Sequence, residues 1–383
     1  MSQAPSVLLV GNWDSGVGYA WWLMESFWVR LAERYRADHR VLLAYPSIST
    51  LSPTIQAAPL EAAALDFRSK SIPALLGQCR FLRRHRVRLM YLSDWGTWSW
   101  RYLLFRLCGV RRIVVHDHTP GERTRPRGVK KWLKLAVNRL PWLAADGAIG
   151  ATDYVRDRLV EVSGFPARRC FSAPNGLPAD SEPELKTPAP IRDLFSIPPD
   201  RAVMVMTGRA NRYKNVQFVI ECMAELRKQG RRDLHFLFIG DGPDLEAFTA
   251  QADGSGVADF CSFPGRREDV PQVLQACDFA IHPSSGEVGY SLSILEYMQA
   301  GLPVLVPDNP SVSGATDDGR TGLVFRRNDR PSAVMAITRL LDEPEPRKAM
   351  GEEARHQVHK RFRLEETHRA LMAAFDSIDG EVD

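Results

Sequence analysis

Cysteine is sparse in this sequence and is not arranged to bind a metal or to form a disulfide framework. The 383 residues include six cysteines, none of them in a CxxC pair, and no histidine lies at zinc-ligand spacing from them. The scatter argues against a structural zinc site and fits a chain that keeps its thiols reduced. The cysteines therefore give no indication of a metal site.

Long apolar runs are also missing. No stretch reaches the ~18 consecutive apolar residues that a membrane-spanning helix needs. The opening residues MSQAPSVLLVGN have no basic residue before their short apolar run, unlike a secretory signal. We therefore expect a cytoplasmic protein, with peripheral contact to the inner face of the plasma membrane as a further option.

Charge and tryptophan are distributed unevenly along the chain. Residues 1–175 hold 26 Lys+Arg against 13 Asp+Glu, whereas residues 176–383 hold 24 against 33. All nine tryptophans also lie in the first of these parts. Basic residues attract anionic partners and tryptophan favours membrane interfaces, so the combination indicates an anionic surface or acceptor. The alternative is a positively charged solubility face with the tryptophans in the core.

Short apolar runs alternate with amphipathic stretches, a pattern typical of βαβ units on a parallel sheet. The alternation occurs twice, so we expect an α/β chain with two Rossmann-like, doubly wound domains that face a cleft. In the first half the runs are Val7–Val10, Val41–Tyr45, Leu89–Leu92, Ile113–Val115 and Ala148–Gly150. In the second half they are Val203–Thr207, Leu234–Ile239, Phe260–Phe263, Phe279–Pro283, Val304–Pro307 and Leu323–Phe325.

A proline-rich stretch separates the two series. Residues 174–199 contain seven prolines, which can neither continue a helix nor occupy the centre of a sheet. We predict an N-terminal domain over 1–177, a linker over 178–200 and a C-terminal domain over 201–364. Residues 365–378 have a helical pattern, and the terminal segment 365–383 could return to pack on the first domain.

The segment TGRANRYKN directly follows a predicted strand in the second half. Gly208 allows a sharp turn at the carboxyl end of that strand, where open α/β sheets bind ligands. Arg209 and Lys214 lie in one loop and can converge on a diphosphate, which would offset its charge without Mg²⁺. Taken alone, the segment could also be a solvated basic loop.

Two further segments follow strands. In FIGDGP, Gly240 and Gly242 permit close approach of the backbone to a nucleotide, although this pattern is of low specificity. After the strand that ends at Pro283, a helix is predicted from Leu292, with Ser291 as its N-cap.

The start of that helix is a candidate phosphate site. Free amides of Leu292 and Ser293 would point at a phosphate, assisted by the helix dipole. Glu296, one turn further on, could accept hydrogen bonds from ribose hydroxyls, and Glu287 in the preceding loop could reach a sugar. Either glutamate, considered alone, could be an ordinary solvated carboxylate.

Together these segments resemble a known family. GRANRYKN, IGDGP, LEYMQAGLPV and, at 173–178, APNGLP occur in the order typical of the retaining glycosyltransferases of GT-B fold, family 4 (glycosyl transferases group 1). The resemblance covers roughly residues 173–325. It implies a metal-independent enzyme that moves a sugar from a UDP- or GDP-sugar to a hydroxyl of a glycan or lipid-linked acceptor, in cell-surface polysaccharide or glycolipid synthesis. No cofactor beyond this donor and no nucleic-acid partner is expected.

The resemblance also implies roles for particular residues. Arg209 and Lys214 match the pair that holds the donor diphosphate, and Glu296 matches the glutamate that binds the ribose. Gly265 and Arg266 match the segment whose backbone faces the base.

The sequence departs from the family pattern at one point. The two glutamates of the family are separated by seven residues, whereas eight separate Glu287 from Glu296. We expect the loop to bulge by one residue, because Gly286 and Gly289 allow unusual backbone angles, so that Glu287 still reaches the donor sugar. Gly289 and Tyr290 are then expected to line the donor site.

The first half contributes candidates of its own. Gly16 and Gly18, in a glycine-rich loop after the first strand, would leave room for donor phosphate or acceptor.

His116 and His118 are two residues apart at the end of a strand, and their side chains hence lie on the same face. They could be a metal pair, although further ligands are lacking, or structural residues. The family resemblance favours His118 as a histidine that contacts the donor sugar, with His116 as the alternative.

Two segments of the first half are rich in aromatic residues. SDWGTWSWR, residues 93–101, holds three tryptophans, and we expect at least two of them in the core. Residues 127–143 combine basic and apolar side chains in a predicted helix that either lies on an anionic membrane or packs as an ordinary domain helix. Two rival functions stay open: a nucleotide-sugar epimerase of similar fold, and a non-catalytic protein that binds an anionic glycan or a membrane.

Overall fold

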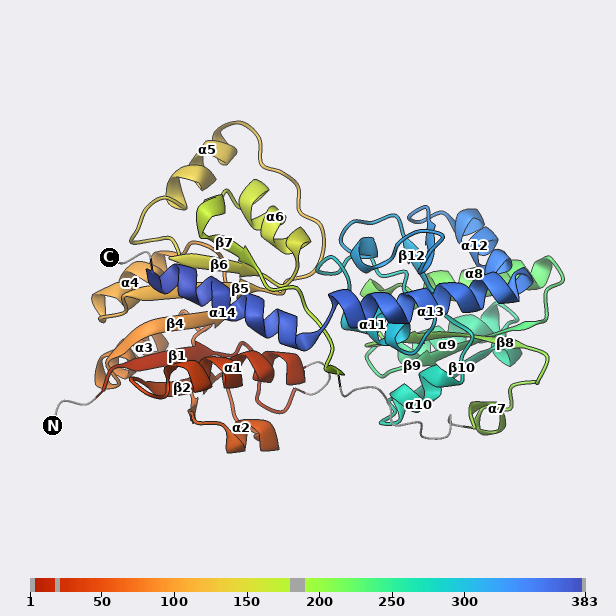
Figure 1. Cartoon of the computed structure of the whole chain (residues 1–383), viewed down its shortest axis with the longest axis horizontal. Coiled ribbons are helices and arrows are strands. Elements are labelled where there is room, and N and C mark those ends of the chain that lie inside the picture. Colours follow the sequence, from red (N-terminus) through yellow and green to blue (C-terminus); the bar gives the residue numbers. More distant parts are fainter. Residues whose placement is uncertain (1–3, 18–20, 180–189, 381–383) are drawn as a thin grey trace. The chain divides into compact units, whose positions relative to one another are not determined.

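The computed structural model describes residues 4–17, 21–179 and 190–380. Its internal contacts divide the chain into two compact units (Figure 1). The first comprises residues 1–119, 123–174 and 367–383, and the second comprises 120–122 and 175–366.

The first unit contains a seven-stranded parallel sheet in the order β3-β2-β1-β4-β5-β6-β7. The chain winds outward from β1 in one direction and, after β3, crosses over to β4 and winds in the other. The strands are β1 (Ser6–Val10), β2 (Arg40–Tyr45), β3 (Glu61–Ala64), β4 (Val87–Ser93), β5 (Arg112–Asp117), β6 (Gly147–Gly150) and β7 (Cys170–Ser172).

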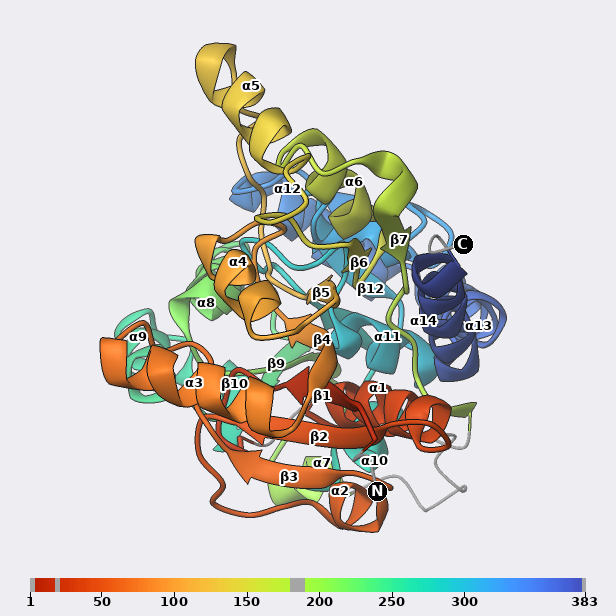
Figure 2. The same cartoon turned by 90° about the vertical axis from the view of Figure 1, so that its left-hand side faces the viewer.

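Helices cover both faces of this sheet, with α1 and α14 on one face and α3 and α4 on the other (Figure 2). On α1, Arg34 forms ion pairs with Asp376 and Asp379 of α14, so the terminal helix belongs to this unit. The helices are α1 (Trp21–Tyr35), α2 (Pro53–Ala57), α3 (Ile72–Arg84), α4 (Trp100–Leu107), α5 (Gly128–Val137), α6 (Asp153–Glu161) and α14 (Leu364–Gly380).

The second unit has a six-stranded parallel sheet in the order β10-β9-β8-β11-β12-β13. The strands are β8 (Ala202–Thr207), β9 (Leu234–Ile239), β10 (Cys261–Gly265), β11 (Phe279–Ile281), β12 (Val304–Pro307) and β13 (Gly322–Phe325). Its helices are α7 (Ile191–Leu194), α8 (Val216–Lys228), α9 (Leu245–Gly254), α10 (Val270–Gln275), α11 (Leu292–Gln299), α12 (Arg330–Asp342) and α13 (Pro344–Arg361).

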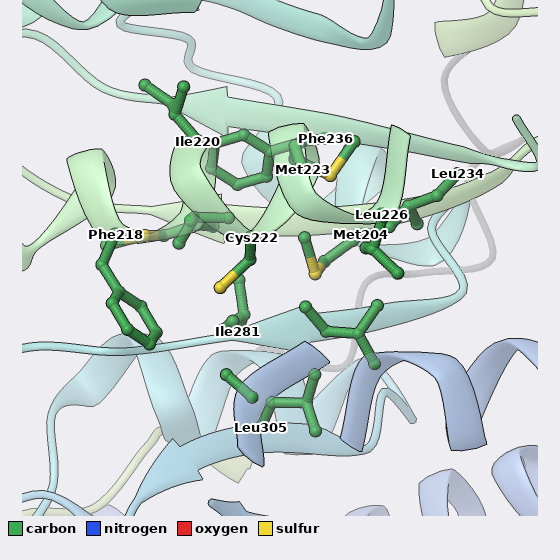
Figure 3. Close-up of a cluster of buried hydrophobic side chains, with 14 of the residues drawn as sticks. Met204, Phe218, Ile220, Cys222, Met223, Leu226, Leu234, Phe236, Ile281 and Leu305 are labelled. Carbon is green, nitrogen blue, oxygen red and sulfur yellow. The ribbon is translucent and has the colours of Figure 1, made fainter. Parts of the chain in front are cut away.

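The core of the second unit forms where α8 packs on this sheet (Figure 3). Cys222, Met223 and Leu226 of α8 are buried and face strand residues such as Met204 and Phe236. Burying a side chain such as Met223 or Leu226 contributes about 1.5–3 kcal/mol. The packing fixes the strand ends from which the loops of the candidate site extend.

The expected fold class is confirmed, because both units are doubly wound parallel sheets. Two edge strands were not predicted: β3 is the alanine-rich EAAA, and β7 is only three residues long.

The prediction that at least two tryptophans of residues 93–101 lie in the core was wrong, because Trp98 and Trp100 are exposed. The helix predicted over 127–143 is α5 alone and ends at Val137.

Candidate functional site

The candidate site of the second unit lies at the carboxyl ends of β8 and β11, where the strand order reverses. The backbones of two loops approach closely here. Gly240 has a φ of +154°, and a Cβ on it would lie 1.7 Å from the carbonyl oxygen of Gly208. Gly242 has a φ of +151°, and a Cβ on it would lie 2.4 Å from the carbonyl oxygen of Ala210. Only glycine fits at these two positions.

Lys214, Glu287 and His282 meet at this edge of the sheet. The Nζ atom of Lys214 lies 2.6 Å from Oε1 of Glu287, and Nε2 of His282 lies 3.0 Å from the same oxygen. Burial raises the pKa of the Glu287 carboxyl, but Lys214 and His282 outweigh it and lower that pKa to about 2. The carboxylate is therefore ionised at neutral pH and holds the lysine in place.

Local backbone structure positions Lys214. A short 3₁₀ turn spans Arg212–Lys214, and the side chain of Asn211 caps it by accepting from the Lys214 amide at 3.1 Å. Asn215 then adopts a left-handed conformation, with a φ of +63°, and α8 begins at the next residue.

The loop that carries Glu287 is held by hydrogen bonds of its backbone. The amide of Glu287 donates to the Ser311 hydroxyl at 3.3 Å, and the carbonyl of Glu287 accepts from the amide of Gly121 at 2.9 Å. Gly289 has a φ of +112°, a conformation that favours glycine. Gly286 does not have a positive φ; it is needed for space, because a Cβ there would lie 2.8 Å from Cα of Gly121.

The start of α11 follows the predicted geometry. Ser291 is the N-cap and accepts from the amide of Ile294 at 3.3 Å. Helix geometry leaves the amides of Leu292 and Ser293 without acceptors inside the helix. Among the described residues, Glu296 forms no side-chain hydrogen bond or ion pair, and burial raises the pKa of its carboxyl. The two amides could bind a phosphate, and the Glu296 carboxyl could bind two hydroxyls.

The side chain of Tyr290 is used in packing. Its hydroxyl donates to the carbonyl of Asn175 at 2.9 Å, and its ring lies edge-on to Phe362. A nucleotide-sugar donor could therefore contact the backbone of Tyr290 but not its side chain.

The remaining predicted residues of this unit lie on the neighbouring loops. Gly208 has a φ of +152°. Arg209 is exposed; its carbonyl accepts from the amide of Asn211 at 2.8 Å, but its side chain has no polar contact within the described part of the chain. Gly265, at the end of β10, has a φ of +78°, and Arg266 beside it is exposed. The side chain of Arg209 is thus available to a ligand.

In the first unit, His118 is the more accessible of the two histidines. Its ring stacks on Phe27 at 5.7 Å, and within the described residues neither ring nitrogen has a hydrogen-bond partner. Its amide donates to the Asp94 carboxylate at 2.7 Å. His116 is fully buried and hydrogen-bonded to Tyr91 at 2.5 Å, which is a structural role.

Other predictions concern the loop after β1, metals and membranes. Gly16 is exposed in that loop, and Gly18 lies outside the described residues. In the described ranges, no three His, Cys, Asp or Glu side chains cluster as metal ligands would. No helix in those ranges is long and apolar enough to cross a bilayer.

Sequence reasoning missed His282 and the Asn309–Ser311 pair. Asn309 accepts from both the amide and the hydroxyl of Ser311, at 2.9 and 2.8 Å, and Ser311 in turn contacts Glu287. The position of His282 at a strand end, five residues before Glu287, was a signal that could have identified it.

Comparison with known proteins identifies the family. The model of glycosyl transferases group 1 matches residues 190–357, and that of glycosyltransferase family 4 matches residues 24–181. The chain is 30% identical over 269 residues to an alpha-D-kanosaminyltransferase of Streptomyces kanamyceticus, covering 66% of this chain and 67% of that protein. It is 28% identical to D-inositol 3-phosphate glycosyltransferase 2 of Catenulispora acidiphila, covering 55% of this chain and 51% of that protein.

Solved structures share the fold. A glycosyltransferase from Rickettsia africae superposes with a TM-score of 0.78 at 14% identity and covers 98% of this chain and 99% of its own. HepE of Anabaena, solved with UDP and glucose, gives a TM-score of 0.72 at 15% identity and covers 97% of this chain and 100% of its own. The chain therefore belongs to glycosyltransferase family 4, with the GT-B fold, and is an enzyme of the class that uses nucleotide-sugar donors.

Proposed function

We propose that the chain transfers a sugar from a UDP- or GDP-sugar to an acceptor hydroxyl with retention of configuration and without a metal ion. The observation that carries this proposal is Lys214, held against buried Glu287 at the reversal of the strand order. HepE, which has the same fold, was solved with UDP, and this supports a nucleotide donor.

The proposed reaction proceeds on one face of the sugar. The acceptor oxygen forms a bond to the anomeric carbon on the side from which the diphosphate departs, and a leaving phosphate oxygen takes the acceptor's proton. Lys214, Arg209 and the amides of Leu292 and Ser293 would offset the charge that develops on the diphosphate. Glu296 would accept hydrogen bonds from the ribose, and Glu287 and His118 would orient the sugar.

Transfer should persist in EDTA, and the product should keep the anomeric configuration of the donor. Transfer should not need a metal because fixed cations and amides offset the charge of the diphosphate. Configuration should be retained because the acceptor attacks the sugar on the same face from which the diphosphate departs. An assay with added EDTA, followed by NMR of the product's anomeric proton, measures both. Strict dependence on Mg²⁺ or Mn²⁺ would contradict the first expectation, and an inverted product would contradict the second.

We further propose that the first unit contacts an anionic membrane through α5, as an enzyme of cell-surface polysaccharide or glycolipid synthesis would. None of the residues of α5 is buried, and Trp132 is 71% exposed and Leu133 62% exposed. Lys130 and Lys131 on the same helix supply positive charge. Exposed Trp100 and Leu107 lie on α4, which is on the same side of this unit as α5 (Figure 2). Such a face binds through charge and buried apolar area together.

The variant Trp132→Ser/Leu133→Ser should release the protein from vesicles that contain phosphatidylglycerol, because it removes the largest exposed apolar side chains of α5. Co-sedimentation measures the bound fraction, and neutral vesicles should bind little of either protein. Met335→Ser, at an exposed apolar residue of the second unit, is the control and should bind as wild type does. Binding that ignores lipid charge, or an unaffected double variant, would rule out this membrane face.

A further inference from the structure

A cavity of about 380 Å³ lies in the first unit, beside the carboxyl ends of β1 and β2. None of the residues that the proposed reaction assigns to the donor, and none of the membrane face, lines it. Its walls are hydroxyl-bearing residues, two tryptophans and one carboxylate: Ser15, Gly16, Trp21, Trp22, Glu25, Ser49, Thr50 and Ser52. Among these described lining residues none is cationic, although the first half of the chain is strongly basic.

Asp14 fixes the two loops that form the walls. Its carboxylate accepts from the Ser47 hydroxyl at 2.7 Å, from the amide of Gly16 at 2.8 Å and from the hydroxyl of Ser49. Hydrogen bonds from Ser49, Ser47 and the Gly16 amide lower the pKa of Asp14 to about 2, so this network is intact at neutral pH. A Cβ on Gly16 would lie 2.5 Å from the Ser49 hydroxyl oxygen, which shows how closely the loops approach.

Glu25 is the unusual member of the lining. It is 5% exposed, and its Oε2 accepts a hydrogen bond from the Ser52 hydroxyl at 2.8 Å. No ion pair reaches Glu25 within the described part of the chain, and burial raises the pKa of its carboxyl. A buried carboxylate is costly unless a cation or a proton accompanies it. The described part of the chain places no cation beside Glu25, so a ligand can supply one.

Aromatic side chains stand beside this carboxylate. Trp21 packs edge-on against Trp28 at 5.2 Å, and Trp28 against Tyr45 at 5.6 Å. Among the described residues, the Nε1 atom of Trp21 and the hydroxyl of Tyr45 are buried without hydrogen-bond partners. Indole faces attract ammonium groups and bind the apolar faces of sugar rings.

We propose that this cavity binds the acceptor through a hydroxylated ring that carries a protonated amine, with the amine at Glu25 and the ring hydroxyls at Ser15, Ser49 and Thr50. The inference rests on the proposed function, because it names the chemical class of the acceptor for that transfer. An ammonium group supplies the charge that Glu25 lacks, and the serine and threonine hydroxyls match a polyol.

The test compares glucosamine, N-acetylglucosamine and glucose as probes at neutral pH, by thermal shift or by ligand-observed NMR. Glucosamine should bind at least about tenfold more tightly than the two uncharged sugars, because only it pairs with the buried carboxylate. Glu25→Gln keeps the shape of the side chain and should abolish this preference. Glu33→Gln, at an exposed position of the same helix, should leave it unchanged.

Nucleotide-sugar titration of the same variants separates this inference from the proposed function. Glu25→Gln should bind the donor as wild type does, which also shows that it is folded. Equal binding of the three sugars, no binding of any of them, or a preference that persists in Glu25→Gln would overturn the inference. Binding of glucosamine without binding of any nucleotide sugar would contradict the proposed function and leave the assignment of the cavity standing.

Discussion

Lys214→Met should reduce sugar transfer about 10²–10³-fold, because it removes a fixed cation from the departing diphosphate. The lysine also balances the buried carboxylate of Glu287, which lies 2.6 Å from it. Breaking such a pair from one side costs up to about 3–5 kcal/mol, so the single variant should also have a lower melting temperature. The stability that comes from the lowered pKa of Glu287 is present at neutral pH and is lost as the pH falls through about 2.

The double variant Lys214→Met/Glu287→Gln separates the two roles. Removing both charges should restore most of the melting temperature, since no buried charge is left unpaired, but transfer should stay low. Lys228→Met, at the exposed end of α8, is the matched control and should be fully active. Near-normal turnover of either Lys214 variant would reject the assignment of Lys214 to the diphosphate.

Gly240→Ala should destabilise the second unit by more than about 3 kcal/mol and abolish donor binding, through strain and overlap together. The φ of Gly240 is +154°, and its new Cβ would lie 1.7 Å from the carbonyl oxygen of Gly208. Neither atom belongs to a flexible side chain, so both loops of the candidate site must move.

Gly230→Ala is the control for this prediction. Gly230 also has a positive φ, of +85°, but a Cβ there would meet no atom within 4 Å. Its variant should lose only about 1 kcal/mol from backbone strain. Thermal unfolding and nucleotide titration of the two variants measure the difference, and equal effects would show that the close approach at Gly240 is unimportant.

Features that depend on neighbouring residues were predictable from sequence. Ser291 caps α11 as expected, because N-capping needs only a hydroxyl three residues before an amide. The central strands of both sheets, such as β1, β4, β8 and β9, are buried on both faces, and their apolar runs therefore stood out. The weakly apolar EAAA of β3 gave no such signal.

Features that depend on distant segments were not predictable. Glu287 reaches Lys214 across 73 residues, and His282 joins them because β11 lies beside β8. The exposure of Trp98 and Trp100 was mispredicted because burial depends on which distant segments cover a side chain, and local sequence does not specify them. For the same reason, periodicity alone could not tell whether α5 buries one of its faces or, as the structure has it, buries none of its residues.

The most direct test of a nucleotide-sugar site in the second unit is calorimetric titration with UDP-, GDP- and ADP-sugars in EDTA, using wild type and Lys214→Met/Glu287→Gln. The account predicts that wild type binds one of these donors without metal and that the double variant, still folded, binds it at least about tenfold more weakly. Failure of wild type to bind any of the three, or equal affinity of the two proteins, would contradict it.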